Sequence, residues 1–125
     1  MSKEALDQLA RTLVEHMKAG FVRRRGAAEA IRHGGFIGDL AAELRVIELG
    51  DLAQEVIDGL LSGSPDAASA AHWAGILRSR VEALETMLYK GGLNGLKEAG
   101  IRIRLGATYE IEARIKEALA KEEGV

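Results

Sequence analysis

The stretch SGSPDAASAAHWAGILRSRVEALETMLYKGG, residues 62–92, is the strongest indication of the fold in this 125-residue chain. Gly63 interrupts any helix before it, Ser64 is placed to cap a new one, and Pro65 suits a first helical position, where a missing N–H carries no penalty. After this boundary, apolar side chains recur every three or four residues, at Ala70, Ala74, Leu77, Val81, Leu84 and Leu88. The pair Gly91-Gly92 ends the pattern, so we expect a long central helix over about residues 65–90.

The composition around this stretch favours helices throughout. Hydrophobic residues make up 47% of the chain and charged residues 29%, but aromatic residues only 4%, and Ala and Leu supply most of the apolar content. Small aliphatic side chains favour close helix packing over a β-sandwich. We therefore expect one all-α domain over residues 1–125, folded as a compact bundle of four to five helices.

Some residue types and patterns are missing from the sequence, and their absence excludes several classes of protein. The chain has no cysteine, which excludes disulfide scaffolds, thiolate zinc sites and cysteine nucleophiles. No apolar run approaches the roughly 20 residues that span a bilayer, and the polar N-terminus does not resemble a signal peptide. We therefore expect a cytoplasmic protein without a membrane partner, in the host cytoplasm if the source is viral.

Glycines divide the remainder of the chain. Helices are expected over residues 3–19, 27–33, 39–61 and about 108–123. Gly20 is interpreted as the end of the first helix, Asp39 as the cap of the third, and Gly50 as the site of a kink or a helix restart. Between the last two helices, Ile-Arg-Ile-Arg-Leu at 101–105 alternates apolar and basic residues, which is typical of a strand. It predicts either a short extended segment that pairs with another subunit, or an irregular connector or helical turn.

Two glycine pairs share the pattern basic-Gly-Gly-apolar-x-Gly and are candidates for binding a phosphate. Glycines that lead into a helix allow backbone N–H groups to converge on an anion, and basic side chains add charge. The candidate ligand-binding residues are Arg23, Arg24, Arg25, Arg32, His33, Gly34, Gly35, Lys90, Gly91 and Gly92. In the simpler interpretation, the glycines end one helix and turn into the next, because neither pair follows a strand or ends in Lys-Ser/Thr.

An acidic helix face offers a metal-dependent alternative. Glu48, Asp51, Glu55 and Asp58 recur at three- and four-residue spacing, similar to the carboxylates of all-helical magnesium-dependent nucleotide pyrophosphohydrolases. A solvated side of an amphipathic helix explains the same residues. The three histidines lie far apart in the sequence, and there is no glycine-flanked serine elbow, so we expect no cofactor and no metal as the main interpretation.

Charge is distributed unevenly along the chain. Residues 1–37 carry seven Lys/Arg against four Asp/Glu, residues 38–75 one against seven, and residues 76–125 nine against eight, for a net charge of −2. This balance argues against extended nucleic-acid binding. Segments of opposite sign are expected where copies of a chain meet each other or another protein, although solvated faces of different sign fit equally well.

These patterns together predict a non-enzymatic binding or assembly protein that forms homo-oligomers. In general type the chain resembles small structural, adaptor and inhibitor proteins of phages and mobile elements. The candidate interface residues are Trp73, Leu77, Val81, Leu84, Leu88, Ile101 and Ile103. The alternatives are a binder of a phosphorylated nucleotide, or the magnesium-dependent pyrophosphohydrolase.

Overall fold

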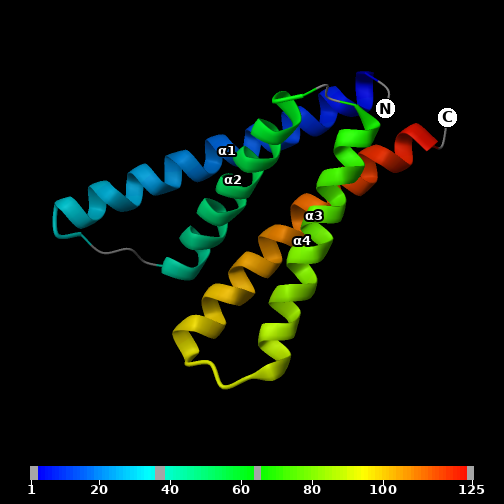
Figure 1. Ribbon diagram of the computed structural model, residues 1–125. Helices are drawn as coiled ribbons and strands as arrows, with labels where there is room; N and C mark the ends of the chain where they lie inside the picture. Colours follow the sequence, from blue (N-terminus) through cyan, green and yellow to red (C-terminus); the bar gives the residue numbers. More distant parts are fainter. Residues whose placement is uncertain (1–2, 36–38, 64–65, 124–125) are drawn as a thin grey trace.

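Four helices make up the computed structural model, which describes residues 3–35, 39–63 and 66–123 (Figure 1). They are α1 (Lys3–Arg32), α2 (Leu40–Leu61), α3 (Ala67–Lys90) and α4 (Gly95–Glu123). The all-α prediction is confirmed for the described residues, and the number of helices agrees with the expected four to five.

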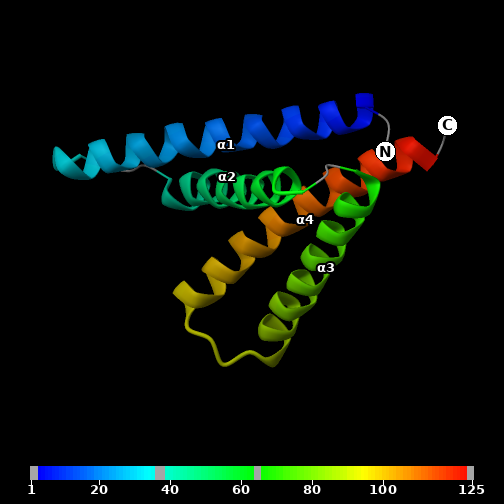
Figure 2. The ribbon, with the colours of Figure 1, turned by 45° about the horizontal axis from the view of Figure 1, so that its top comes forward.

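The helices form two hairpins, α1 with α2 and α3 with α4. Helix α4 packs against all three others, whereas α2 and α3 barely touch. The hairpins meet near the two chain ends and diverge toward their loops in both views (Figures 1 and 2). The molecule is therefore open on one side, between α2 and the α3–α4 hairpin.

Single residues determine where several of the helices begin or end. The Asp39 side chain accepts a hydrogen bond from the Ala42 N–H at 3.0 Å, which confirms the predicted cap of α2. Asp66 caps α3 in the same way through the Ser69 N–H at 2.9 Å, whereas the expected cap and first residue, Ser64 and Pro65, lie outside the described residues. Helix α3 ends at Lys90, as predicted.

The predicted break at Gly20 is wrong, because α1 continues through it to Arg32. The expected short helix at 27–33 is the end of the same helix. Gly20 is buried where α1 crosses α2, and a Cβ atom on it would lie 3.0 Å from the Gly50 Cα. A Cβ on Gly50 would lie 2.7 Å from the His16 carbonyl oxygen. The two glycines allow two unbroken helices to touch backbone to backbone. Helix α2 continues through Gly50, so the predicted helix restart there is wrong.

The predicted extended segment at 101–105 is also wrong, because these residues lie within α4. Ile101 is buried and Ile103 is half-buried, so neither forms an edge that could pair with another strand. Thr108, where the last helix was expected to begin, lies inside α4 and donates its hydroxyl to the Arg104 carbonyl at 2.7 Å. The physical reason is that α4 packs against three helices and buries side chains on more than one side. Its apolar residues are therefore closer together in the sequence than those of a helix that buries a single face.

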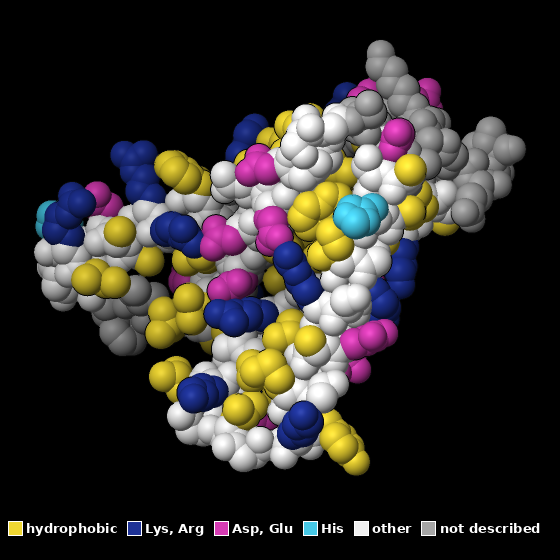
Figure 3. Space-filling view, in the orientation of Figure 1, with side chains coloured by type: hydrophobic (Ala, Val, Ile, Leu, Met, Phe, Trp, Pro, Cys, Tyr) yellow, Lys and Arg dark blue, Asp and Glu magenta, His cyan; other side chains and the backbone are white. Residues whose placement is uncertain are grey.

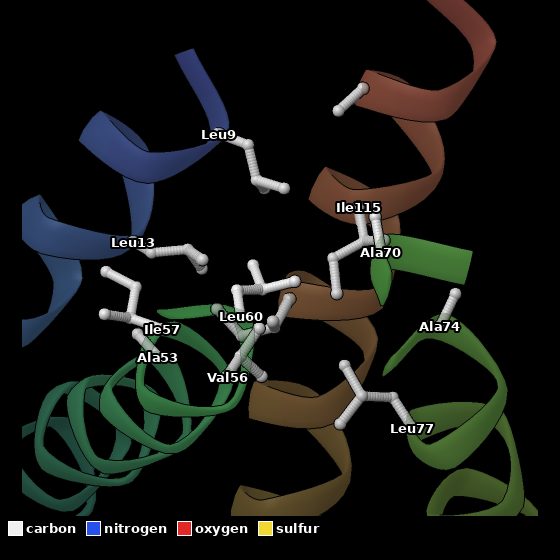
Figure 4. Close-up of a cluster of buried hydrophobic side chains, with 12 residues drawn as sticks. Leu9, Leu13, Ala53, Val56, Ile57, Leu60, Ala70, Ala74, Leu77 and Ile115 are labelled. Carbon is white, nitrogen blue, oxygen red and sulfur yellow. The ribbon is translucent and has the colours of Figure 1, made fainter. Parts of the chain in front are cut away.

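The core lies where all four helices meet. Side chains from each helix point toward a common centre there (Figure 4). Its fully buried members are Leu13, Val56, Ala53, Ala70, Leu77, Ile111 and Ile115. This core fixes the closed end of the molecule and leaves the opposite end open.

Candidate functional site

A cleft of about 360 Å³ opens between α2, α3 and α4. We call it the notch and define it by the residues that line it: Glu48, Asp51, Leu52 and Glu55 from α2, Arg80, Ala83 and Leu84 from α3, and Arg104, Ala107 and Thr108 from α4. Acidic side chains over α2 face basic side chains of the other hairpin across the middle of this face (Figure 3). The notch thus has one acidic wall, one basic wall and an apolar floor.

Part of the charge in the notch is neutralised within the chain. Arg80 donates two hydrogen bonds to the Glu55 carboxylate, at 2.9 and 2.5 Å. These hydrogen bonds lower the pKa of Glu55, against the opposing effect of partial burial, and they raise the pKa of Arg80. Asp51 pairs with Arg24 of α1. The Arg80–Glu55 pair joins the two hairpins across their open side.

Two charges of the notch stay unpaired. Glu48 on α2 and Arg104 on α4 form no ion pair among the described residues, although both line the cleft. A surface with one free carboxylate and one free guanidinium suits an occupant of mixed charge better than a simple anion. A second hollow of about 270 Å³ continues past Ala107 between α2 and α4, where Arg45 and Arg102 add further positive charge.

The acidic face predicted as a metal alternative is split by the fold. Glu48, Asp51 and Glu55 line the notch, whereas Asp58 is exposed and lies outside it. In residues 3–35, 39–63 and 66–123, no group of three His, Asp or Glu side chains is placed to hold a metal ion. Two of the three notch carboxylates already bind arginines.

The two glycine pairs are not brought together. Gly34-Gly35 follows α1 and Gly91-Gly92 follows α3, at the far ends of the two diverging hairpins (Figure 1). Gly34, Gly91 and Gly92 have φ of 68°, 68° and 72°, a region that favours glycine. Both pairs follow helix C-termini, where the helix dipole repels anions rather than attracts them.

The amides of the first glycine pair are already used. The Gly34 N–H donates to the Ile31 carbonyl at 3.1 Å, and the Gly35 N–H donates to the Ala30 carbonyl at 2.6 Å. These hydrogen bonds are those of a helix ending in a left-handed glycine. The geometry agrees with the simpler interpretation of this pair, a helix end that turns the chain.

The basic residues near the first glycine pair do not converge on one site. Arg23 pairs with Glu43 of α2 at 3.1 Å, and Arg24 pairs with Asp51. Arg32 at the end of α1 and His33 just after it both lie 3.4 Å from Glu29 of α1, and Arg25 is exposed. Part of the charge asymmetry in the sequence is therefore an attraction between α1 and α2 within one chain.

The predicted interface residues lie at different depths. Leu77 and Val81 are fully buried and Ile101 is 6% exposed, so these three side chains pack within the chain. Leu84, Leu88 and Ile103 are half-buried. Trp73 is also half-buried and packs against the core, where a Cβ atom on Gly59 would lie 2.2 Å from its ring.

A charged cluster between α3 and α4 was not predictable from the sequence. Glu112 is 4% exposed, and its carboxylate lies 3.4 Å from Arg78 Nε and 3.7 Å from Lys116 Nζ. Arg78 also lies over the Tyr109 ring, 6.0 Å from its centre, and the Tyr109 hydroxyl donates to Glu85. That hydrogen bond raises the pKa of Tyr109. The members come from two helices, with no short motif to link them.

Comparison with protein-family models, curated proteins and solved structures finds no match for this chain. Among the described residues, none of the helices combines the length and the apolar content needed to cross a lipid bilayer.

Proposed function

We propose that this protein is a non-enzymatic assembly protein that associates with further copies of itself. The observation that supports the proposal most is the solvent-accessible surface area of the chain. The chain exposes 8019 Å², whereas a compact monomer of its mass is expected to expose about 6,500 Å². The excess, about 1,500 Å², exceeds the roughly 800 Å² that each partner contributes to a standard protein–protein interface.

Apolar side chains on both hairpins support this proposal. Phe21, Val22, Ile31, Leu40, Leu61, Met87, Tyr89 and Leu96 are all at least 46% exposed. A single exposed apolar side chain needs no explanation, but this set includes both aromatic and large aliphatic residues on all four helices. Contact with another copy would remove part of this surface from water.

The charges of the notch support a protein partner over a nucleotide. A phosphate site needs several donors directed at one point, and here Arg80 already binds Glu55, while Arg104 faces a wall of carboxylates. The nucleotide binder and the pyrophosphohydrolase thus have less support than association between copies, and they become outcomes of the test.

Light scattering coupled to size-exclusion chromatography tests the proposal from low to high micromolar concentration. The expected mass is a multiple of 13.4 kDa that rises with concentration. A mass of one chain at every concentration would contradict the proposal. A thermal-shift series with nucleoside triphosphates tests the alternatives: a rise with nucleotide alone would favour capture, and a rise that requires magnesium, with turnover, would favour the enzyme.

A further inference from the structure

The outer face of α1 carries a regular row of side chains that the fold does not use. Its members follow one another at alternating steps of four and three residues: Arg11, Glu15, Lys18, Val22, Arg25, Glu29 and Arg32. All seven are exposed. The steps keep the row on one side of the helix, opposite the buried Leu9, Leu13 and Gly20. We call it the α1 row.

Most charges of the α1 row have no partner within the chain. Arg11, Glu15, Lys18 and Arg25 form no ion pair among the described residues. Among the described residues, Glu29 pairs only with Arg32 of the row and with His33, the residue that follows α1. Helix α1 lies along one edge of the molecule, with open space beyond it (Figure 2). A second helix therefore has access to the row.

The mixed signs of the row identify the kind of partner. A nucleic acid or an anionic lipid surface would meet Glu15 and Glu29 between the cations, and both carboxylates would repel it. Val22 is the only apolar member of the row, and with the neighbouring exposed Phe21 it offers too little apolar surface for burial in a membrane interface. Another helix with alternating charges fits better, because its side chains repeat with the same seven-residue period.

The charges of the α1 row are complementary to those of a second α1 helix that runs in the opposite direction. If two copies of α1 lie antiparallel with a two-fold axis at the level of Gly20, Arg11 meets Glu29 of the second copy and Glu15 meets its Arg25. The symmetry generates each contact twice, which makes four pairs of opposite charge. Parallel pairing would place cation opposite cation, and an axis shifted to the level of Val22 would place Glu15 opposite Glu29.

The same register places apolar side chains near the axis. Phe21 is 68% exposed and Val22 is 65% exposed, and both lie within two residues of Gly20. Val22 lies opposite Lys18 of the second copy in this register, so the centre of the pair consists of apolar side chains and the aliphatic part of Lys18, with the charged pairs on either side.

We propose that two copies of this chain pair antiparallel through the α1 row, with Glu15 of each copy opposite Arg25 of the other. The proposal rests on the self-association proposed above and names the surface that performs it. It leaves the notch free for a different contact.

Charge exchange tests the pairing. Glu15→Lys places like charges opposite each other twice, and we expect the dimer dissociation constant to rise about tenfold. Arg25→Glu is expected to weaken the dimer by a similar factor. Combining Glu15→Lys with Arg25→Glu restores opposite charges in the exchanged order, so the affinity is expected to return toward that of the unmodified chain.

A matched control separates this effect from net charge. Glu82→Lys makes the same change at an exposed position on α3, outside the row, and is expected to leave the dissociation constant unchanged. Circular dichroism melting of each variant confirms that the fold persists. If Glu15→Lys and the double variant associate as the control does, the α1 pairing is wrong, while self-association stands. If the unmodified chain is a monomer at every concentration, both proposals fail.

Spin labels test the orientation independently, because the chain has no cysteine of its own. In the antiparallel pair, two labels at a Lys18→Cys variant are offset by about 6 Å along the helix axis, and two labels at Gln8→Cys by about 36 Å. A clearly shorter distance for position 18 is the expected result. Equal distances for the two positions would indicate parallel pairing and would overturn the proposal.

Discussion

The two helical hairpins are held together by different means. At the crossing of α1 and α2, Gly20 and Gly50 bring the backbones into contact, and a Cβ atom on Gly50 would lie 2.9 Å from the Gly20 Cα. In α3 and α4, large side chains such as Leu77 and Ile111 fill the space between the helices. The first hairpin therefore depends on the absence of side-chain atoms and the second on their volume.

This difference also affects what each hairpin can tolerate. A glycine contact leaves no room for added atoms, because backbones cannot change rotamer. A contact between large side chains tolerates small shifts but loses free energy when atoms are removed, because a cavity remains. Substitutions that add or remove a few carbon atoms thus distinguish the two hairpins.

Leu77→Ala is expected to have the largest effect on stability. Leu77 is fully buried in the core, so the substitution leaves a cavity and lowers the free energy of unfolding by about 3–5 kcal/mol. Urea unfolding followed by circular dichroism measures this loss. Leu61→Ala, at a side chain that is 70% exposed, is the control and is expected to change stability by less than about 1 kcal/mol. Equal losses for the two variants would contradict the volume-dependent packing.

Gly50→Ala is expected to have the next largest effect. Its Cβ would lie 2.7 Å from the His16 carbonyl oxygen, so the two helices must separate, at a cost of about 2–3 kcal/mol. Urea unfolding of Gly50→Ala and Gly20→Ala, with Gly50→Ala the less stable, checks this contact. Stability equal to that of the unmodified chain would mean that the backbones do not meet at this crossing.

Gly75→Ala is expected to stabilise the protein, in contrast to substitution of the two crowded glycines. Gly75 lies in α3 with open space around it, so a methyl group meets nothing and helix propensity improves. We expect the free energy of unfolding to rise by about 0.5–1 kcal/mol. Gly100→Ala in α4 is a second open site and serves as a replicate, and thermal melting of both variants provides the measurement. A loss at both sites would show that these glycines have contacts that the fold does not reveal.

These glycines also explain how far the sequence could predict the fold. The cap at Asp39 and the end of α3 at Lys90 were predictable, because a short acceptor side chain and a glycine pair act locally. The role of Gly20 was not predictable, because a glycine that ends a helix cannot be told in the sequence from one that allows two helices to touch. Only the position of Gly50 on a distant segment distinguishes them.

The candidate site was predictable only in part. The acidic spacing of Glu48, Asp51 and Glu55 correctly indicated one helix face, and the structure places all three in the notch. The partners of Asp51 and Glu55, Arg24 and Arg80, lie 27 and 25 residues away on other helices, so no local pattern could pair them. The alternation at 101–105 misled because α4 is buried on more than one side.

The smallest expected effect concerns the pair between Glu55 and Arg80, which is the only ion pair between α2 and α3 among the described residues. Arg80 lowers the pKa of Glu55 below its ordinary value of 4.5. A carboxyl whose pKa is lower in the folded state stabilises the fold above the unfolded pKa, and this contribution disappears as the pH falls through the folded pKa. Both side chains are more than 40% exposed, so the contribution is expected to be below about 1 kcal/mol.

Arg80→Gln should therefore lower the urea midpoint slightly at neutral pH, and the difference from the unmodified chain should vanish well below pH 4.5. A double-mutant cycle with Glu55→Gln isolates the pair from other effects of each substitution. A difference that persists undiminished in acid would mean that Arg80 stabilises the open side by packing, and that the charge of Glu55 has no part in it.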